Sequence, residues 1–280
     1  MRVCLASGKG GTGKTLLSTN LADHLARHFQ KVSYLDADVE EPNGFLFLEP
    51  EIERLTRVAV QLPGVGKEGC TACGACADFC AFNALLVVEG GVMVFNELCH
   101  SCGGCLRVCP AGVLVEQPRE IGSLRLGHRG RLKCADGRLD VGEPRAVPVI
   151  ERLLDWTAGD SLSVIDAPPG TACNATCVVQ SCDFVILVTE PTPFGLHDLR
   201  LAVEMCRLLE KPAVAVINRS DLGDDGVRRY LDGAGVRVVA ELPFERAIAD
   251  AYAAGELAVE HSPTLRRVVE TLAREVLRAV

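Results

Sequence analysis

Four glycines and two lysines are crowded into residues 8–15, GKGGTGKT, directly after a short apolar run. They match the pattern G-x-x-x-x-G-K-[ST], in which backbone N–H groups and the N-terminus of a following helix bind phosphate. In this pattern Lys14 contacts the β- and γ-phosphates, and the Thr15 hydroxyl binds Mg²⁺. The residues expected at a nucleotide are therefore Gly8, Gly10, Gly11, Thr12, Gly13, Lys14, Thr15 and Leu16.

Eight of the 14 cysteines form two runs with the same spacing, C-x₂-C-x₂-C-x₃-C, and the second run begins twenty-nine residues after the first. This spacing is typical of bacterial ferredoxins with two [4Fe-4S] clusters, in which the fourth cysteine of each run ligates the other cluster. We therefore expect one cluster on Cys70, Cys73, Cys76 and Cys109, and another on Cys99, Cys102, Cys105 and Cys80.

Zinc is the alternative occupant, because pairs of cysteines two residues apart also bind zinc. Zinc sites usually separate two such pairs by a longer loop, whereas each run here has three evenly spaced cysteines. The spacing therefore favours iron–sulfur clusters, and Gly74, Gly103 and Gly104 allow the backbone to approach them closely. Pro110 follows the second run but Ala81 follows the first, a departure that removes no ligand.

The elements that must position these residues alternate between apolar runs and helical patterns. Runs of strand length occupy residues 3–7, 32–38, 162–170, 183–191, 213–221 and 236–244. Continuous apolar runs suit parallel strands buried on both faces. Helical spacing covers residues 14–28 and 199–209, and a terminal helix over 264–280 has one apolar face. The pattern predicts an α/β fold with a doubly wound, mostly parallel sheet.

Residues 62–116 break this alternation, since they are rich in glycine and cysteine and contain the repeated run. Loop closure entropy grows by only about 0.6 kcal/mol per doubling of loop length. An insert that folds by itself is therefore tolerated when its ends lie close together. We predict that residues 1–61 and 117–280 form one nucleotide-binding domain and that 62–116 form an inserted domain of the two-cluster ferredoxin type.

Lys9 adds a second lysine to the glycine-rich loop, and with it the sequence resembles the MinD/ParA/Mrp superfamily of deviant P-loop ATPases. The resemblance implies ATP rather than GTP, and an ATP-dependent homodimer in which Lys9 reaches the partner's nucleotide. Because no arginine finger is apparent, we expect slow hydrolysis suited to a switch. The segments EEPN, GRLDVGEP, DAPPGT and VTEPTPFGLHDL extend the likeness over almost the whole chain. Together with the cysteines, they resemble the MinD-superfamily ATPases that contain an inserted ferredoxin domain.

The same resemblance implies roles for further residues. In LDADVEEPN, Asp38 would orient the attacking water and Asp36 would support the Mg²⁺ site. In VIDAPPG, Asp166 would hold Mg²⁺ through water and Gly170 would sense the γ-phosphate. Phosphoryl transfer needs mainly positioning and neutralisation of charge, which these groups and the lysines supply. The residues expected beside the base are Asn218, Pro243 and Phe244.

Composition excludes several classes of protein. The net charge of −8 argues against nucleic acid as the main partner. No stretch approaches the 18 or so apolar residues of a membrane helix, and residue 1 leads almost directly into a strand, so a cytoplasmic protein without a signal peptide is expected. Thiols stay reduced there, which favours metal binding over disulfides. The basic stretch 125–133 is interpreted as a solvated hairpin, with a docking patch for an acidic partner as the alternative.

Among the remaining cysteines, Cys4, Cys182 and Cys206 lie in apolar patterns and are expected in the core. Cys173 lies seven residues after Asp166, the offset at which the nitrogenase iron protein has a ligand of its dimer-bridging cluster, and Cys177 follows one helical turn later. A third cluster at a dimer interface is therefore a hypothesis beside the simpler interpretation of reduced thiols.

Two functions suit these motifs. In the first, ATP binding closes a dimer and controls electron transfer through two [4Fe-4S] clusters to a redox partner. In the second, the protein is a scaffold or carrier that assembles or delivers a cluster, as in the Mrp-type carriers. Complete four-cysteine ligation favours retained, redox-active clusters and hence electron transfer. A positioning ATPase of the MinD or ParA kind, with sensory clusters, is a further alternative.

Overall fold

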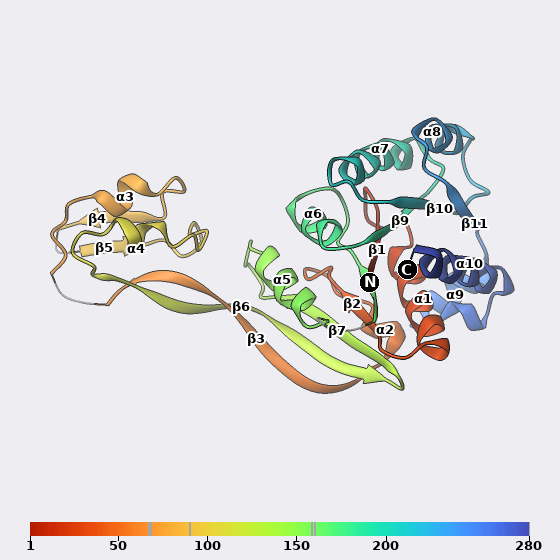
Figure 1. The fold of residues 1–280 in the computed structure, drawn as a ribbon, viewed down its shortest axis with the longest axis horizontal. Coiled ribbons are helices and arrows are strands. Elements are labelled where there is room, and N and C mark those ends of the chain that lie inside the picture. The colour runs from red at the N-terminus through yellow and green to blue at the C-terminus, as the bar shows by residue number, and fades with distance from the viewer. Residues whose placement is uncertain (67–68, 90, 158, 160, 280) are drawn as a thin grey trace.

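The computed structural model describes residues 1–66, 69–89, 91–157, 159 and 161–279. In this part of the chain a nine-stranded sheet forms the centre of the larger body in Figure 1. Its order is β11 (Val238–Leu242), β10 (Ala213–Asn218), β9 (Phe184–Thr189), β1 (Arg2–Ala6), β8 (Leu162–Asp166), β2 (Val32–Asp36), β7 (Leu132–Leu139), β6 (Leu114–Arg129) and β3 (Glu51–Val65).

The strands from β11 to β7 are parallel, and β6 and β3 complete the sheet as antiparallel strands. The parallel strands β1, β2, β8 and β9 are almost fully buried, which explains their continuous apolar sequences. The predicted doubly wound, mostly parallel sheet is confirmed.

Helices cover both faces of this sheet because alternate residues of each strand point to opposite sides. One core contains Leu5, Tyr34 and Ile186 and packs on helices α1 (Lys14–His28), α9 (Arg246–Ala253) and α10 (Pro263–Ala279). The other contains Cys4, Leu35 and Leu187 and packs on the helices of the second face. These are α5 (Val147–Asp155), α6 (Cys173–Gln180), α7 (Pro193–Leu208) and α8 (Gly226–Ala234). The short helices α2 (Phe45–Leu48) and η1 (Ala258–Glu260) complete this body.

Strands β3 and β6 are long enough to leave the sheet, and we call their projecting part, residues 59–65 and 114–120, the stalk. Near the sheet β6 pairs with both β3 and β7, from Gly122 opposite Leu139 to Arg129 opposite Leu132. Beyond that point only β3 and β6 pair, as far as Val65 opposite Leu114. Figure 1 shows this two-stranded ribbon extending away from the helices.

The stalk carries a small unit at its tip, residues 66–113, which we call the module (Figure 1). It contains α3 (Ala75–Phe79), β4 (Leu85–Val88), β5 (Gly91–Val94) and α4 (Gly104–Val108), with β4 and β5 paired as an antiparallel hairpin. The predicted ends of the inserted domain, residues 62 and 116, lie inside β3 and β6. The predicted domain therefore includes the outer part of the stalk as well as the module.

The basic stretch 125–133 forms the turn between β6 and β7, as the hairpin interpretation predicted. It is only partly solvated, since Leu126 and Leu132 are buried. Two of its three arginines are engaged within the chain, because Arg125 pairs with the buried Asp136 and Arg129 donates to the Leu48 carbonyl oxygen at 2.8 Å. Arg131 and Lys133 are exposed, so the alternative of a docking patch for an acidic partner stays untested.

Candidate nucleotide and cluster sites

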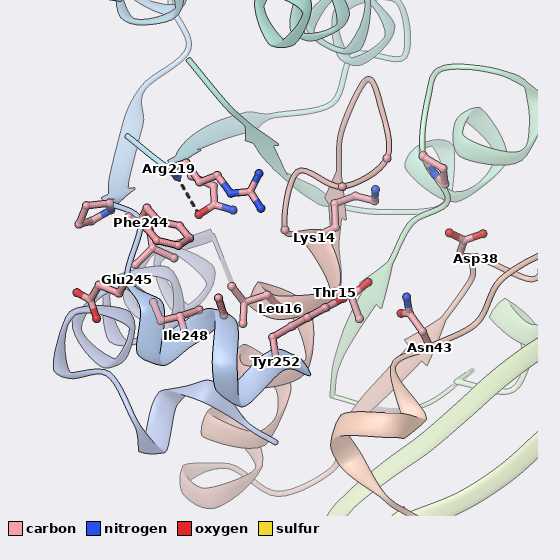
Figure 2. Close-up of a pocket in the computed structure, with 18 of the residues that line it drawn as sticks. Lys14, Thr15, Leu16, Asp38, Asn43, Arg219, Phe244, Glu245, Ile248 and Tyr252 are labelled. Carbon is pink, nitrogen blue, oxygen red and sulfur yellow. Dashed lines mark hydrogen bonds between the residues drawn. The ribbon is translucent and has the colours of Figure 1, made fainter. Parts of the chain in front are cut away.

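The carboxyl ends of the parallel strands meet at one edge of the sheet, which is where doubly wound folds bind ligands. A cavity of about 490 Å³ opens there between the glycine-rich loop and helix α9 (Figure 2). Ten of the predicted nucleotide-site residues line it, namely Gly10, Gly11, Gly13, Lys14, Thr15, Leu16, Asp38, Asn218, Pro243 and Phe244. Gly8, Lys9, Thr12, Asp36, Asp166 and Gly170 do not line this cavity.

Lys14 is the first residue of α1, and its side chain is held back against the loop. Its Nζ donates a hydrogen bond to Ser7 Oγ at 2.9 Å, and Ser7 Oγ donates to the Lys9 carbonyl oxygen at 2.5 Å. Burial lowers the pKa of Lys14, while the nearby Asp166 and Asp38 favour its charged form. A buried ammonium in this position fits the neutralisation of phosphate charge.

Gly13 precedes α1 in a left-handed conformation, with φ at 98°, that glycine adopts readily. A Cβ atom there would lie 2.5 Å from Asn218 Nδ2. Asn218 in turn donates to the Thr12 carbonyl oxygen at 2.9 Å, so it fastens the end of β10 to the loop. Asn218 lines the cavity, and its amide also holds the loop in place, while its predicted contact with the base stays a prediction.

Asp36 ends β2 beside Asp166 at the end of β8, because the two residues are paired in the parallel register. Asp36 accepts hydrogen bonds from Gly44 N–H at 2.7 Å and from Asp38 N–H at 3.2 Å, so it shapes the loop that presents Asp38. Burial and then the charge of Asp166 raise the pKa of Asp36. In this structure Asp36 holds the loop that carries Asp38, and its support of a Mg²⁺ site stays a prediction.

Asp166 is buried, and within the described residues both of its carboxylate oxygens lack a hydrogen-bond partner. Burial raises its pKa, and the nearby Thr15 hydroxyl and then the charge of Lys14 oppose that rise, although Thr15 lies outside normal hydrogen-bond geometry. A buried carboxylate without partners is costly unless a cation compensates it. Mg²⁺ is commonly held by one or two carboxylates together with substrate phosphates. The donor set of Asp166 with Thr15 therefore fits Mg²⁺ bound with a nucleotide.

Asp38 lines the cavity opposite the loop (Figure 2). Burial and then the charge of Asp166 raise its pKa from 3.8 to about 6, although Lys14 lowers it. Its carboxylate therefore titrates close to neutral pH, as suits a group that orients a water molecule or accepts its proton.

Lys9 does not face the cavity in the single chain. Its Nζ lies 3.6 Å from Glu190 Oε2, and Glu190 also pairs with Arg219 Nη1 at 2.9 Å. Gly170, with φ at 88°, contacts the residue just before the glycine-rich loop, since its N–H donates to the Ser7 carbonyl oxygen at 3.0 Å. Lys9 and Gly170 therefore both lie close to the nucleotide cavity, but the contacts they make here were not predicted from the sequence.

The cavity also has walls that sequence reasoning missed. Arg219, Ile248 and Tyr252 line it together with the predicted Phe244 (Figure 2). Apolar and aromatic walls with a few polar groups suit a flat ring. Arg219 directly follows Asn218 at the end of β10, so its place could be inferred, whereas Ile248 and Tyr252 lie on α9 without a motif.

The two cysteine runs open onto two separate cavities in the module. Cys70, Cys73, Cys76 and Cys109 line the first, and Cys80, Cys99, Cys102 and Cys105 line the second. These are the two predicted ligand sets, including the exchange of the fourth cysteine between runs. Within the described residues, no group of three or more His, Cys, Asp or Glu side chains is arranged to hold a metal ion.

The module is built twice over with an offset of twenty-nine residues. Helices α3 and α4 begin at equivalent positions, each capped by a glycine of positive φ, Gly74 at 81° and Gly103 at 68°. Two residues before each glycine the chain is again left-handed, at Ala72 with φ 53° and Ser101 with φ 58°. The same turns therefore wrap both runs around their cavities.

Backbone amides point at the fourth cysteine of each run. Ala84 N–H donates to Cys80 Sγ at 3.4 Å. At the equivalent position, the amide of Val113, followed by those of Leu114, Ala111 and Gly112, lowers the pKa of Cys109. Amides that stabilise thiolates are the environment a cluster ligand needs. The eight cysteines thus line two cavities in the pairing predicted for two [4Fe-4S] clusters, and cluster binding itself stays a prediction.

The other cysteines lie in the larger body. Cys4, Cys182 and Cys206 are buried in one core, as predicted. Cys173 is exposed and Cys177 half-buried, one turn apart on α6. The hypothesis of a third cluster on these two thiols stays untested. No helix in the described ranges is both long and apolar enough to span a membrane.

Fold and cavity together define an α/β nucleotide-binding protein of the P-loop class. The chain belongs to the CobQ/CobB/MinD/ParA nucleotide binding domain family, whose sequence profile matches residues 3–259. Membership places it among nucleotide-binding ATPases and agrees with the resemblance found in the motifs.

Relatives and solved structures extend this assignment. An uncharacterised protein of Methanocaldococcus jannaschii is 25% identical and covers 99% of this chain and 98% of its own length. An iron-sulfur cluster carrier protein of Pyrococcus abyssi is 26% identical over 87% of this chain and 74% of its own. The septum site-determining protein MinD of Pyrococcus horikoshii, solved with Mg-ADP, is similar with a TM-score of 0.60 and 18% identity, over 98% of this chain and 95% of its own.

Proposed function

We propose that this protein is an ATP-driven switch that controls electron transfer through two [4Fe-4S] clusters held by the module. The observation that carries the proposal is the gathering of eight cysteines into two cavities of four, each with a thiol from the other run. When bound, the two clusters supply one-electron redox centres. The chain supplies their ligands, the amides around them and the stalk that joins them to the nucleotide-binding domain.

At the nucleotide site, the loop amides and Lys14 bind and neutralise the phosphates, while Thr15 and Asp166 hold Mg²⁺. Asp38 orients the attacking water, and its raised pKa lets it accept a proton near neutral pH. Phe244 and Tyr252 enclose the base. Because few groups contribute to chemistry beyond positioning and charge, the reaction is a slow, switch-like hydrolysis.

ATP also brings two chains together in this proposal, with Lys9 reaching the nucleotide of the partner. The exposure of Lys9 at the loop supports this role, since 31% of its side chain is accessible. Lys9 must leave Glu190 before it can cross an interface. Dimer closure would therefore begin with the exchange of an ion pair within the chain for a contact with the partner's phosphate.

A carrier of iron–sulfur clusters is the second candidate, and the names of several relatives favour it. In a carrier the cluster is cargo and must leave readily. Four cysteines at each cavity, with Cys76, Cys99 and Cys105 buried, favour clusters that stay bound. The ligand sets therefore support electron transfer over delivery.

One experiment separates the two functions. The anaerobically reduced protein is mixed with ATP or ADP, and cluster absorbance and EPR are followed after addition of a soluble electron acceptor or of an apo-ferredoxin. Electron transfer predicts nucleotide-dependent oxidation with iron retained. Nucleotide-dependent loss of iron to the apo-protein would instead support the carrier, and nucleotide-independent behaviour in both assays would refute coupling.

A further inference from the structure

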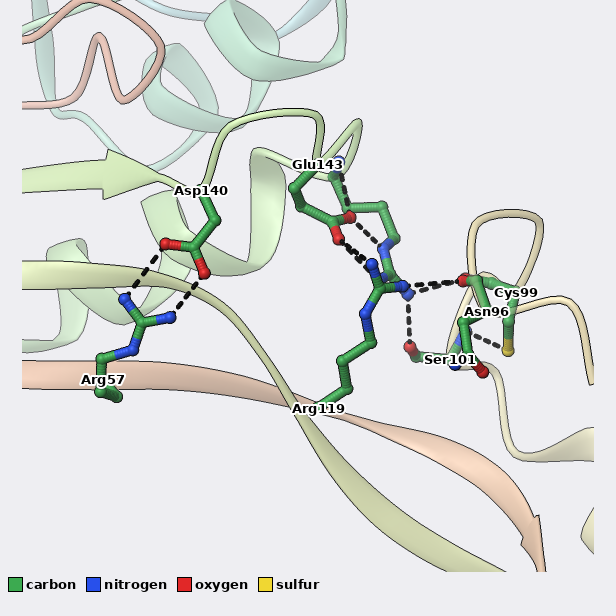
Figure 3. Close-up of polar contacts among 8 residues, drawn as sticks. Arg57, Asn96, Cys99, Ser101, Arg119, Asp140 and Glu143 are labelled. Atoms are coloured by element: carbon green, nitrogen blue, oxygen red, sulfur yellow. Dashed lines mark hydrogen bonds and ion pairs between the residues drawn. The ribbon is translucent and has the colours of Figure 1, made fainter.

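Arg145 joins the nucleotide-binding domain to the second cysteine run. It lies in the loop between β7 and α5, and its guanidinium donates to the Cys99 carbonyl oxygen at 2.8 Å and to Ser101 Oγ at 3.4 Å (Figure 3). The same guanidinium forms a double hydrogen bond with Glu143, at 2.5 and 3.0 Å. The side chains of Arg145 and Glu143 are only 11% and 3% exposed, so this ion pair is buried and is not a surface contact.

A second arginine repeats the contact from the stalk. Arg119 of β6 lies 3.2 Å from Glu143 Oε2 and donates to the Asn96 carbonyl oxygen at 3.1 Å (Figure 3). One buried carboxylate thus orients two guanidinium groups, and each of them holds the backbone just before or at the first ligand of the second run. We call Arg119, Glu143 and Arg145 with the segment 96–101 the clamp.

The loop that carries Glu143 and Arg145 begins at the end of β7, close to the nucleotide cavity. Leu139 N–H, at the end of β7, donates to the Val39 carbonyl oxygen at 2.8 Å, next to the cavity residue Asp38. Asp140 N–H then donates to the Ile121 carbonyl oxygen at 2.9 Å, where the stalk begins. Val39 and Cys99 also belong to one continuous apolar core. The turn at Cys99 is therefore connected to Asp38 through packed, hydrogen-bonded elements.

In the part of the chain that the structure describes, the first run has no such attachment. Its turn at residues 70–72 is the equivalent of 99–101, twenty-nine residues earlier. Within the described residues, no side chain of the larger body forms a hydrogen bond or ion pair with that turn. Each cavity also has one stalk residue in its lining, Leu114 in the first and Pro63 in the second, so the stalk does not distinguish the two runs. The two halves of the module are alike in backbone but differ in what holds them.

We propose that Arg145 is a positioning residue for the cluster on Cys80, Cys99, Cys102 and Cys105, which fixes the Cys99 turn to the nucleotide-binding domain and sets the reduction potential of that cluster alone. The inference rests on the proposed function for the presence of two clusters. Under this inference, nucleotide binding affects the second-run cluster, and the first-run cluster is the one farther from that influence.

The expected sign follows from charge. Reduction adds an electron to a cluster, so a nearby positive charge or hydrogen-bond donor favours the reduced form and raises the potential. Arg145→Gln removes the guanidinium and leaves the buried Glu143 carboxylate with Arg119 alone, so it lowers the potential. Glu143→Gln leaves two guanidinium groups beside the Cys99 turn without their carboxylate, so it raises the potential.

The test is an EPR-monitored redox titration of the anaerobic protein, in which a Cys73→Ser variant identifies the signal of the first-run cluster. The matched control is Arg57→Gln, because Arg57 also links β3 to the same loop, through Asp140 at 2.5 Å, without contact to the cysteines (Figure 3). We expect opposite shifts of the second-run potential for Arg145→Gln and Glu143→Gln, and none for Arg57→Gln. Equal shifts of both clusters, or no shift in either clamp variant, would overturn the proposal.

Amide hydrogen exchange gives a measurement that does not need a loaded cluster. In Arg145→Gln the segment 96–103 is expected to exchange faster than in the wild type, while 70–76 is unchanged, in protein with or without iron. Unchanged exchange at 96–103 would remove the positioning role. If the wild type binds no iron but this selective exchange is observed, the proposed function fails and the attachment of the turn by Arg145 stands.

Discussion

Lys9 Nζ lies 3.6 Å from Glu190 Oε2 of its own chain, with 31% of the lysine side chain and 9% of the glutamate side chain exposed. The residue expected to act on a partner's nucleotide is thus held within the monomer. A pair of this kind is worth about 0.2–1 kcal/mol. The Lys9–Glu190 pair is weak enough for Lys9 to leave Glu190 on dimerisation, and strong enough to oppose dimerisation slightly.

Glu190→Gln is therefore expected to increase the fraction of dimer formed with a non-hydrolysable ATP analogue. A loss of up to 1 kcal/mol corresponds to up to about a fivefold change in the equilibrium constant. Analytical ultracentrifugation measures this fraction, with Glu241→Gln as control because Glu241 forms an ion pair with Arg228 away from the loop. Dimerisation equal to or weaker than that of the wild type would show that Glu190 does not restrain Lys9.

Lys9→Ala and Lys14→Ala are each expected to lower ATP hydrolysis by about a hundredfold or more, as the loss of a charge that stabilises the transition state typically does. They should differ in binding. Lys14→Ala weakens nucleotide binding to the monomer, whereas Lys9→Ala leaves it intact and prevents the ATP-dependent dimer. Steady-state hydrolysis and fluorescent-nucleotide titration check both, and a fully active Lys9→Ala protein would contradict action across the interface.

Asp38 predicts a pH dependence of hydrolysis. Its pKa is raised to about 6 by burial and by Asp166, and the ionised carboxylate is the form that orients water. The rate should rise about tenfold per pH unit below that value and level off above it. The Asp38→Asn variant should hydrolyse ATP more slowly, and its rate should no longer rise with pH in this range. If wild type and Asp38→Asn show the same pH profile, another group titrates.

The same shift has a consequence for stability. Because the pKa of Asp38 is higher in the folded chain than its ordinary value of 3.8, folding without nucleotide is disfavoured above pH 6, and that cost is relieved as the pH falls from about 6 to about 4. Asp38→Asn should therefore raise the Tm of the nucleotide-free protein at pH 7 and leave it unchanged near pH 4. An equal change in Tm at both pH values would rule out ionisation of Asp38 as the cause.

The exchange of the fourth cysteine can be tested with two double variants. Cys80→Ala with Cys102→Ala removes two ligands of one cluster, and about four iron atoms per chain should remain. Cys80→Ala with Cys73→Ala damages both clusters, so little iron should remain. Iron analysis and EPR distinguish these results, and the reverse outcome would show that each run keeps its own fourth cysteine. A wild-type count of about ten rather than eight would revive a third cluster at Cys173 and Cys177.

Much of the fold follows from local sequence. The helix over Lys14–His28 coincides with the predicted range, and the six predicted apolar runs are all strands, because buried parallel strands need continuous apolar sequence. The stalk was missed. Strand β3 mixes charged residues with Val58, Val60 and Leu62 and contains Pro63, and its partner β6 lies some sixty residues away, a pairing no local pattern encodes.

Some features of the candidate sites likewise follow from local sequence, and others do not. The cysteine spacing predicts which thiols share a cavity, since short turns fix their geometry. Arg145 was not predicted, although it directly follows the recognised GRLDVGEP segment, because its partners Cys99 and Ser101 lie more than forty residues away. Tyr252 and the contact of Lys9 with Glu190 likewise depend on tertiary packing alone.

The coupling of nucleotide to the clusters is tested most directly by measuring the potential of the second-run cluster with ADP and with a non-hydrolysable ATP analogue. The account predicts that the analogue shifts this potential in the wild type, that the first-run cluster changes less, and that Lys9→Ala abolishes the shift. Superimposable titrations with the two nucleotides, in a wild-type protein shown to bind both, would contradict it.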